Sequence, residues 1–316
     1  MAGYLFRNQR QGNHPFLCKG KTLVMVLYEP FEGRVFQIPE SLAMGRVQNQ
    51  KDIQAETGIG KEPIAFVTRT AQNSVHQYLT GQRMGRNIAV ILAGGSGARL
   101  GSDVPKQFLE IDGRTILEYS IEAFENHPAI DAIAIVSRSD YMERVRSIVS
   151  GRGYHKVERI IPGGKERYHS SLAAINVYDD EDILLFHDAV RPLVSSRIID
   201  DCLAAMKKYN AVDVAFNTTD TIIQVDSDNC ICAIPDRTFL RNGQTPQCFR
   251  RSVISKAYNV ALADPKFKTT DDCGVVLRYL PEEPVYVVQG DVTNMKVTYK
   301  EDLEQIQRLL HLREVL

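Results

Sequence analysis

Short apolar runs alternate with helix-like segments from Asn87 onward, and this alternation constrains the fold more than any other feature of the chain. The apolar runs, which predict buried strands, cover residues 88–92, 132–136, 157–161 and 183–186. Helical spacing of apolar residues predicts helices at 116–126, 141–150, 170–177, 195–209, 252–262 and 300–310. Buried strands separated by helices are typical of a parallel sheet covered on both faces. The sequence therefore predicts an α/β fold, a doubly wound and mostly parallel sheet, with ligands at the carboxyl ends of the strands.

The alternation is interrupted near residue 221 by a polar turn between two strand-like runs. Residues 221–225 and 230–234 flank the turn segment 226–229 (DSDN), and this arrangement predicts a β-hairpin. Because the hairpin falls outside the alternating pattern, we expect it to project from the sheet as an arm within residues 221–247. A strand at 285–288 and the last helix then restore the α/β order.

Residues 1–85 do not share this organisation. They contain two strand-like runs, at 22–28 and 64–68, and no internal repeat or recognisable motif. Met84 comes directly before the first strand of the α/β domain, which we place at 86–316. Two interpretations of the N-terminal segment stay open: an appended piece upstream of a natural start at Met84, or a small accessory domain of unknown role.

Composition narrows the class of protein. The net charge of −1 predicts no general attraction to nucleic acid or to anionic membranes. No apolar run approaches the roughly 18 residues that a membrane span needs. The six cysteines are scattered, with one C-x-C pair, so the sequence indicates neither a zinc site nor a disulfide framework. We therefore expect a cytoplasmic protein with reduced thiols.

A glycine-rich loop at 92–100 (LAGGSGARL) follows the first apolar run, and the segment 105–108 (PKQF) comes shortly after it. The loop and its flank supply three glycines and two cations, which are Gly94, Gly95, Gly97, Arg99 and Lys106. Without Cβ atoms the backbone can bring N–H groups close to phosphates, and polyphosphate needs such cations. A plain glycine-rich turn with solvated cations is the alternative. The P-loop pattern is absent, and the third glycine of G-x-G-x-x-G is missing.

Two more clusters follow predicted strands. The segment 187–192 (HDAVRP) places Asp188 at a strand end, where its carboxylate could bind Mg²⁺; a capping Asp paired with Arg191 is the alternative. We interpret His187 as structural. The segment 163–170 (GGKERYHS) opens a helix, so its small residues can donate N–H groups to a ligand, and Ser170 offers a hydroxyl for a base edge.

Polar segments nearer the C-terminus are less specific when considered alone. They are PDR at 235–237, GQTPQ at 243–247, TDD at 270–272 and GDVTNMKVT at 290–298. Arg237 and Thr245, eight residues apart, suit a phosphate or a hydroxyl-rich substrate, but a surface role fits equally well. The TDD segment is also a common helix N-cap pattern.

The motif L-A-G-G-x-G-x-R followed by P-K-Q-F is similar to that of nucleotidyltransferases that activate sugars and polyols. It resembles most closely the cytidylyltransferases for methylerythritol phosphate and ribitol phosphate, over residues from about 87 to 310. The resemblance implies a Rossmann-like nucleotidyltransferase fold, CTP and a polyol phosphate as substrates, Mg²⁺ as cofactor, and a homodimer in which the arm reaches the neighbouring subunit. It adds no expectation of nucleic acid or membrane as a partner.

The resemblance also assigns roles to individual residues. It implies catalytic cations at Arg99, Lys106 and Lys296. It implies contacts with CTP at Leu92, Ala93, Gly94, Gly95, Gly97, Gly164, Arg167, Ser170, Asp188 and Arg191. It implies contacts with the polyol phosphate at Thr221, Arg237, Thr245, Thr270 and Asp271, and metal ligation by Asp188 and Asp291.

The choice between the two polyols depends on small motif differences. Methylerythritol enzymes usually have H-D-A-A-R-P and A-L-T-P-Q, whereas this chain has H-D-A-V-R-P and G-Q-T-P-Q, closer to the ribitol enzymes. We therefore favour ribitol 5-phosphate, whose CDP derivative would feed a teichoic acid or capsule polymer. Methylerythritol phosphate is the alternative. A protein that senses CTP without turnover is a third hypothesis, which the full set of expected cations disfavours.

Overall fold

The computed structural model describes residues 85–95 and 104–315, together with short strands among the first 84 residues. The chain divides into two units, Met1–Met84 and Gly85–Leu316. Described strands of the first unit are β1 (Gly3–Phe6), β2 (Phe16–Lys19), β3 (Thr22–Val26), β4 (Val35–Ile38) and β5 (Ile64–Ala65). They form a sheet in the order β4-β3-β2-β1-β5, in which only the β1–β5 pair is parallel.

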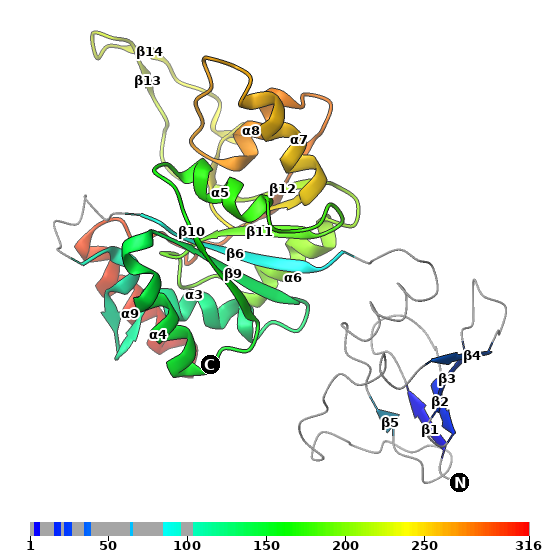
Figure 1. The fold of residues 1–316 in the computed structure, drawn as a ribbon. Helices are drawn as coiled ribbons and strands as arrows, with labels where there is room; N and C mark the ends of the chain where they lie inside the picture. The colour runs from blue at the N-terminus through cyan, green and yellow to red at the C-terminus, as the bar shows by residue number, and fades with distance from the viewer. Residues whose placement is uncertain are drawn as a thin grey trace. The chain divides into compact units, whose positions relative to one another are not determined.

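An eight-stranded sheet organises the second unit (Figure 1). Its strands are β6 (Asn87–Ala93), β9 (Ala132–Ser137), β10 (Val157–Pro162), β11 (Ile183–Asp188), β12 (Ala211–Asn217), β15 (Arg241–Gly243), β16 (Gln247–Arg250) and β17 (Val285–Gln289). Strands β10, β9, β6 and β11 are parallel neighbours in that order. Strand β16 joins β11 to β12 in antiparallel fashion, and β17 lies parallel to β12. The predicted mostly parallel sheet is confirmed, with an antiparallel strand inserted beside β11.

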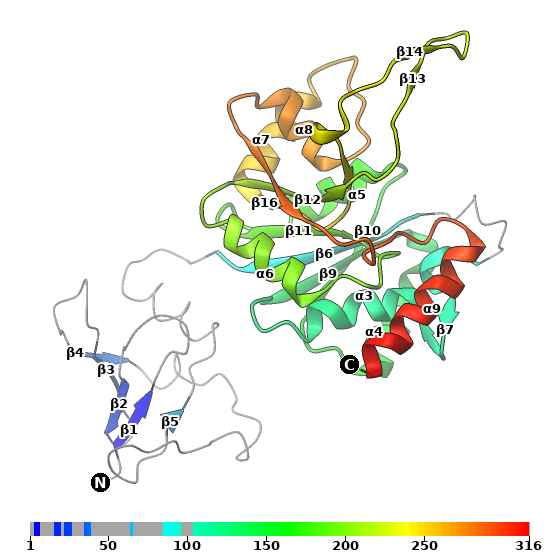
Figure 2. The same ribbon diagram turned by 180° about the vertical axis from the view of Figure 1, so that it is seen from behind.

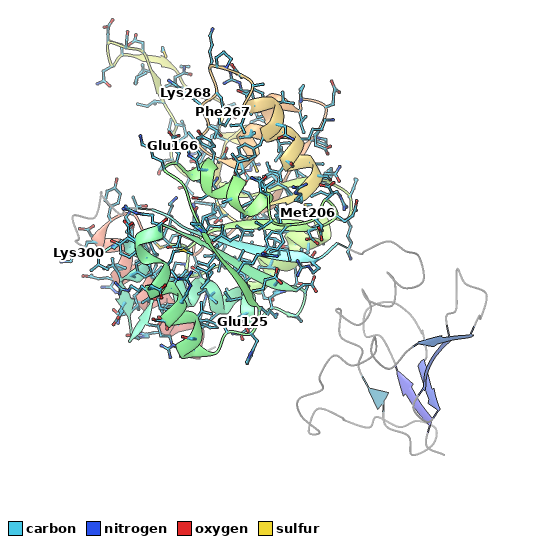
Figure 3. The ribbon with its side chains drawn as sticks, in the orientation of Figure 1. Glu125, Glu166, Met206, Phe267, Lys268 and Lys300 are labelled. Carbon is cyan, nitrogen blue, oxygen red and sulfur yellow. The ribbon has the colours of Figure 1, made fainter. Side chains whose placement is uncertain are left out.

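Helices cover both faces of this sheet. They are α3 (Ile116–Glu125), α4 (Met142–Arg152), α5 (Arg167–Ile175), α6 (Ser196–Ala205), α7 (Arg251–Ala261), α8 (Asp272–Tyr279) and α9 (Lys300–Val315). Successive residues of one strand point to opposite faces, so β6 contributes Ala89 and Ile91 to one core, with α3, α4 and α6. It contributes Ile88 and Val90 to the other core, with α5, α7 and α8. Side chains fill the space between the layers (Figure 3). Because helices pack on both faces of the sheet, the predicted double winding is confirmed.

Local signals in the sequence set several helix starts. Thr115 caps α3: its side chain accepts from the Glu118 N–H while the Glu118 carboxylate accepts from the Thr115 N–H. The side chain of Ser195 caps α6, and that of Asp271 caps α8 through the Gly274 N–H. The TDD segment at 270–272 therefore does act as an N-cap, which was one of the two interpretations of its pattern.

The predicted arm is present. Strands β13 (Gln224–Val225) and β14 (Ile231–Ala233) pair in antiparallel fashion and project away from the sheet (Figures 1 and 2). The paired part is shorter than the sequence predicts, because the register shifts between residues 224 and 225. Among the described residues, no helix is long and apolar enough to cross a membrane.

Candidate active site

A cavity of about 770 Å³ opens at the carboxyl ends of the parallel strands. Its walls come from the ends of β6, β9, β10 and β11, from the start of α5, and from the segment before α9. The predicted site residues that line it are Leu92, Gly94, Gly95, Lys106, Gly164, Arg167, Ser170, Asp188 and Lys296. These residues span more than 200 positions of the chain, and the parallel topology brings them together as expected for this class of sheet.

Glycines let the backbone approach closely at the start of α5. A Cβ atom on Gly163 would lie 2.7 Å from the Ser170 hydroxyl, and one on Gly164 would lie 2.3 Å from the Cβ of His169. Real Cβ atoms do not approach that closely, so a side chain at Gly163 would displace the Ser170 hydroxyl and one at Gly164 would displace His169. The Ser170 hydroxyl is thereby held at the cavity wall beside the β10–α5 turn.

The segment after the glycine loop is tied to the sheet by a residue that the sequence analysis did not single out. Gln107 Nε2 donates to the carbonyls of Ala93 (2.7 Å) and Gly95 (3.2 Å), and the side chain is buried. Lys106 Nζ donates to the carbonyl of Thr298 (3.0 Å). The P-K-Q motif therefore links the first strand to the segment that carries Lys296.

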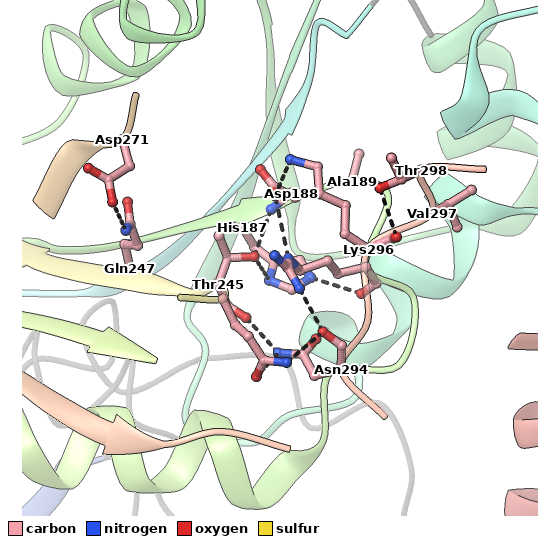
Figure 4. A network of polar contacts seen from close by, with 12 residues as sticks. His187, Asp188, Ala189, Thr245, Gln247, Asp271, Asn294, Lys296, Val297 and Thr298 are labelled. Atoms are coloured by element: carbon pink, nitrogen blue, oxygen red, sulfur yellow. Dashed lines mark hydrogen bonds and ion pairs between the residues drawn. The ribbon is translucent and has the colours of Figure 1, made fainter. Parts of the chain in front are cut away.

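Asp188 ends β11, and its carboxylate lies among positively charged side chains in the cavity (Figure 4). Its Oδ2 accepts from Lys296 Nζ at 2.9 Å and lies 3.4 Å from Arg191 Nε. Burial alone would raise the pKa of Asp188, but Lys296, Arg167 and Arg191 outweigh burial and hold this pKa well below its usual range. The carboxylate is therefore ionised at neutral pH.

Arg167 lies between two carboxylates. Its Nη1 donates to Asp272 Oδ2, and the charge of Asp188 also acts on it. Burial opposes the charged guanidinium, but these two carboxylates raise the pKa of Arg167 above its usual value. Asp272 is fully buried and also accepts from the Tyr258 hydroxyl at 2.5 Å. The sequence analysis assigned no role to Asp272, because an Asp at the start of a helix is common and gives no sign of a contact with the distant Arg167.

His187 is a buried neutral residue, as the sequence analysis expected. Its Nε2 lies 3.0 Å from the Arg191 carbonyl, its Nδ1 lies 3.0 Å from Thr245 Oγ1, and its ring meets the edge of Phe124. Burial lowers the pKa of His187 to about 4. Thr245, predicted to contact the polyol phosphate, is buried and does not line the cavity.

The remaining predicted residues lie elsewhere or belong to undescribed segments. Thr221, Arg237 and Thr270 are exposed, and Arg237 Nη1 donates to the Thr219 carbonyl on the arm. Asp271 accepts from Gln247 Nε2 at 3.1 Å. Ala93 is buried, and Arg191 supports Asp188 from outside the lining. Gly97 and Arg99 lie outside the described residues.

Asp291 was predicted as a metal ligand, but it is not in the cavity lining. Its Oδ1 accepts from the backbone N–H (2.8 Å) and the hydroxyl (2.9 Å) of Thr293, so the carboxylate organises its own turn. Within the described part of the chain, no group of three or more His, Cys, Asp or Glu residues could hold a metal. Among the described residues, three carboxylates line the cavity, Asp140, Glu166 and Asp188, and of these Asp188 is the one that ends a parallel strand. Mg²⁺ commonly binds through one or two carboxylates plus substrate phosphates.

Comparison with known proteins gives a consistent result. The family model described as 2-C-methyl-D-erythritol 4-phosphate cytidylyltransferase matches residues 87–311. A protein of that name from Thermobifida fusca is 48% identical over 235 residues, 72% of this chain and 94% of the relative. A bifunctional ribulose 5-phosphate reductase/CDP-ribitol pyrophosphorylase from Haemophilus influenzae is 45% identical over 72% of this chain and 49% of its own length.

Solved structures agree at the level of the fold. The crystal structure of 4-diphosphocytidyl-2C-methyl-D-erythritol synthase from Anaerococcus prevotii matches with a TM-score of 0.64 and 28% identity. The match covers 72% of this chain and 96% of that one. A 2-C-methyl-D-erythritol 4-phosphate cytidylyltransferase from Francisella tularensis matches with a TM-score of 0.59 and 27% identity, over 71% of this chain and 99% of that one.

Proposed function

We propose that this chain, which belongs to the 2-C-methyl-D-erythritol 4-phosphate cytidylyltransferase family and is a cytidylyltransferase, transfers the cytidylyl group of CTP to D-ribitol 5-phosphate. The products are CDP-ribitol and pyrophosphate. The observation that carries the reaction class is the convergence of Lys106, Arg167 and Lys296 with Asp188 on one cavity at the ends of the parallel strands. Preorganised cations of this kind stabilise charge that develops during phosphoryl transfer.

The reaction needs positioning more than acid–base chemistry. A phosphate oxygen of the polyol phosphate attacks the α-phosphorus of CTP, forming a new P–O bond while the bond to pyrophosphate breaks. The attacking phosphate is already anionic, so no strong general base is required. Lys296 Nζ and the Arg167 guanidinium line the cavity and would bind the phosphates in line for attack. Mg²⁺, held by Asp188 and by the phosphates, would neutralise further charge when bound.

Two residues support ribitol 5-phosphate as the acceptor. Val190 stands where methylerythritol enzymes usually have alanine, and it lines the cavity. Gln244 stands where they usually have leucine; its Nε2 donates to the carbonyls of Asp291 (2.7 Å) and Asn294 (3.0 Å). Of the departures from the methylerythritol pattern, Val190 thus lies in the cavity lining, and Gln244 bonds to the segment that leads to Lys296. The Haemophilus influenzae relative, whose name includes CDP-ribitol pyrophosphorylase, is 45% identical.

A second candidate acceptor is 2-C-methyl-D-erythritol 4-phosphate. The name and the 48% identity of the Thermobifida fusca relative favour it. Its chemistry would use the same cavity and the same cations, because both acceptors present a phosphate monoester. The two candidates differ only in the polyol that must fit beside the nucleotide.

The arm supports a homodimer. Its described residues include several large apolar side chains that are exposed: Ile222, Ile223, Val225, Ile231, Ile234 and Phe239. Exposed apolar groups on a projecting hairpin are typical of an interaction surface, and a second copy of the chain is the partner that would also bring Arg237 to a neighbouring cavity. Light scattering after size exclusion should give the mass of a dimer, and Phe239→Asp should shift it toward that of a monomer.

Pyrophosphate release tests the proposed reaction. The full chain would be given CTP and Mg²⁺ with ribitol 5-phosphate or methylerythritol 4-phosphate at equal concentration. Faster release with ribitol 5-phosphate is the expected outcome. Faster release with methylerythritol 4-phosphate would keep the mechanism and replace the acceptor, whereas release with neither would refute cytidylyl transfer to both.

A further inference from the structure

The hydroxyl group of Thr245 lies between the backbone of Asp188 and the imidazole of His187 (Figure 4). The Asp188 N–H donates to Thr245 Oγ1 (3.1 Å), and the same oxygen is 3.0 Å from His187 Nδ1. Thr245 is 5% exposed and His187 is fully buried. The side chain expected to touch the polyol phosphate is therefore turned toward the strand end that carries Asp188.

The surroundings of the His187 ring fix the direction of these hydrogen bonds. Nε2 lies 3.0 Å from the carbonyl oxygen of Arg191, and a carbonyl only accepts, so Nε2 carries the ring proton. Nδ1 is then an acceptor and takes the hydroxyl proton of Thr245. The Thr245 oxygen accepts the N–H of Asp188. Its proton and one of its lone pairs are thus both occupied.

The backbone of Thr245 also contacts the segment that carries Lys296, the partner of Asp188 in the cavity ion pair. Its carbonyl accepts from Asn294 Nδ2 (2.8 Å), and Asn294 is fully buried. The Asn294 carbonyl accepts from Arg191 Nη1 (2.7 Å). Since Asn294 precedes Lys296 by two residues, one threonine contacts the segments that present both Asp188 and Lys296.

We infer that Thr245 and His187 are positioning residues, which fix the backbone of Asp188 so that its carboxylate faces Lys296 in the cavity. The inference rests on the proposed cytidylyl transfer, because it assigns how the reacting site is held. It differs from the role that family resemblance implies, in which Thr245 touches the polyol phosphate. A positioning residue changes the geometry of the reacting groups and thus kcat, whereas a substrate contact that is equal in ground and transition states changes KM.

Three variants of the full chain separate these roles. Thr245→Val keeps the shape of the side chain and removes the hydroxyl, so kcat should fall about tenfold or more, with less than about a threefold change in KM for the polyol phosphate. Thr245→Ser keeps the hydroxyl and should stay within about threefold of the wild-type kcat. Thr218→Val is the control: Thr218 is also buried, but its hydroxyl lies near the Asp220 carbonyl, outside this network, so neither constant should change.

Nitrogen-15 NMR at neutral pH gives a readout that does not depend on turnover. With labelled histidine, and with His187→Asn to assign the signal, His187 should appear as the Nε2–H tautomer. Its Nδ1 resonance should move in Thr245→Val and not in Thr218→Val. If the wild type turned over neither acceptor while these shifts held, the proposed cytidylyl transfer to these two acceptors would be refuted and the hydrogen-bonded arrangement would stand.

Other outcomes overturn the inference itself. A Thr245→Val enzyme with an unchanged kcat and a KM for the polyol phosphate raised about tenfold would show a direct substrate contact. A serine variant as slow as the valine variant would show that the hydroxyl is not what matters. An Nδ1–H tautomer in the wild type would reverse the assigned hydrogen bonds whatever the activity, and it can be observed even if Thr245→Val does not fold.

Discussion

Two carboxylates of the sheet, the buried Asp188 and the half-buried Asp213, behave in opposite ways. Asp188 on β11 faces Lys296, Arg191 and Arg167, which keep its pKa well below the usual range against the effect of burial. Asp213 on β12 instead accepts from Gln247 Nε2 at 3.1 Å. Burial raises the pKa of Asp213 to about 6, and the charge of Asp271 adds to that increase.

The difference shows what the cations of the cavity do. Burial penalises both carboxylates, so removal from water does not by itself decide their charge. Asp188 is surrounded by cations and stays ionised, so it keeps the negative charge that binding of a metal ion would require. Asp213 shares the amide of Gln247 with a second carboxylate, Asp271. Its charged form is the less stable one in the folded protein below about pH 6.

The largest expected effect comes from removing a cation beside Asp188. Lys296→Gln keeps most of the side-chain length and removes the charge that pairs with Asp188 at 2.9 Å. Loss of one preorganised charge at a reacting phosphate costs about a hundredfold or more in kcat. Pyrophosphate release at saturating CTP and acceptor measures it, with the acceptor that the wild type prefers.

Lys256→Gln is the matched control for this change. Lys256 is exposed on α7 and does not line the cavity, so the same loss of charge there should leave kcat unchanged. If kcat in Lys296→Gln decreased by less than about fivefold, Lys296 would not be one of the residues that stabilise the transition state. The contrast between the two carboxylate centres would then concern stability alone.

A smaller effect is expected where Arg167 is anchored. Asp272→Asn removes the buried charge that faces the Arg167 guanidinium and leaves that cation facing Asp188 alone. Breaking a fully buried ion pair costs about 3–5 kcal/mol. Because the Arg167 side chain is 29% exposed, we expect the free energy of unfolding to fall by only about 2 kcal/mol. Urea denaturation at pH 7 measures this change, and the KM for CTP should rise with it.

Tyr258→Phe distinguishes the charge of Asp272 from its other contact. It removes only the hydroxyl that donates to Asp272 Oδ1 and keeps the Arg167 ion pair, so the free energy of unfolding should fall by less than in Asp272→Asn. If this variant were destabilised as much as Asp272→Asn, the tyrosine contact rather than the Arg167 ion pair would be the stabilising feature.

Regular elements of the fold were predictable wherever apolar residues followed a clear period. The four parallel strands β6, β9, β10 and β11 and the helices α3, α4, α6 and α7 were placed within a few residues of their observed bounds. Strand β12 was missed because Asp213 interrupts its apolar run, and β16 was missed because only four residues form it. Helix α8 was missed because its eight residues are too few to show a helical period.

The cavity was predictable where one motif follows one strand. The glycine loop, Asp188 and the start of α5 were identified in this way, since strand ends converge in a parallel sheet. The partners of these residues were not predictable, because they depend on contacts between distant segments. Asp272 meets Arg167 across 105 residues, and Thr245 meets Asp188 across 57. No local pattern reports which carboxylate a given arginine will face.

The smallest expected effect lies at Asp213, and it depends on pH. With a pKa of about 6 in the folded state against 3.8 in the unfolded chain, the folded protein binds this proton more tightly. The contribution of Asp213 to stability is therefore greatest below about pH 4 and declines as pH rises from about 4 to about 6. Asp213→Asn cannot ionise, so it avoids that decline and keeps an oxygen that can accept from Gln247.

The free energy of unfolding of Asp213→Asn, relative to wild type, should accordingly be about 1 kcal/mol larger at pH 8 than at pH 4. The effect is this small because Asp213 is not completely shielded from solvent. Urea denaturation at both pH values measures it. Comparing the variant with the wild type cancels the opposite trend of Asp188, whose low pKa lowers stability only below about pH 4.

Asp220→Asn, at an exposed carboxylate, is the control and should show no such difference. A difference for Asp213→Asn that stays constant with pH would mean that Gln247 alone compensates the burial of this carboxylate, and the two centres would then differ in geometry and not in charge.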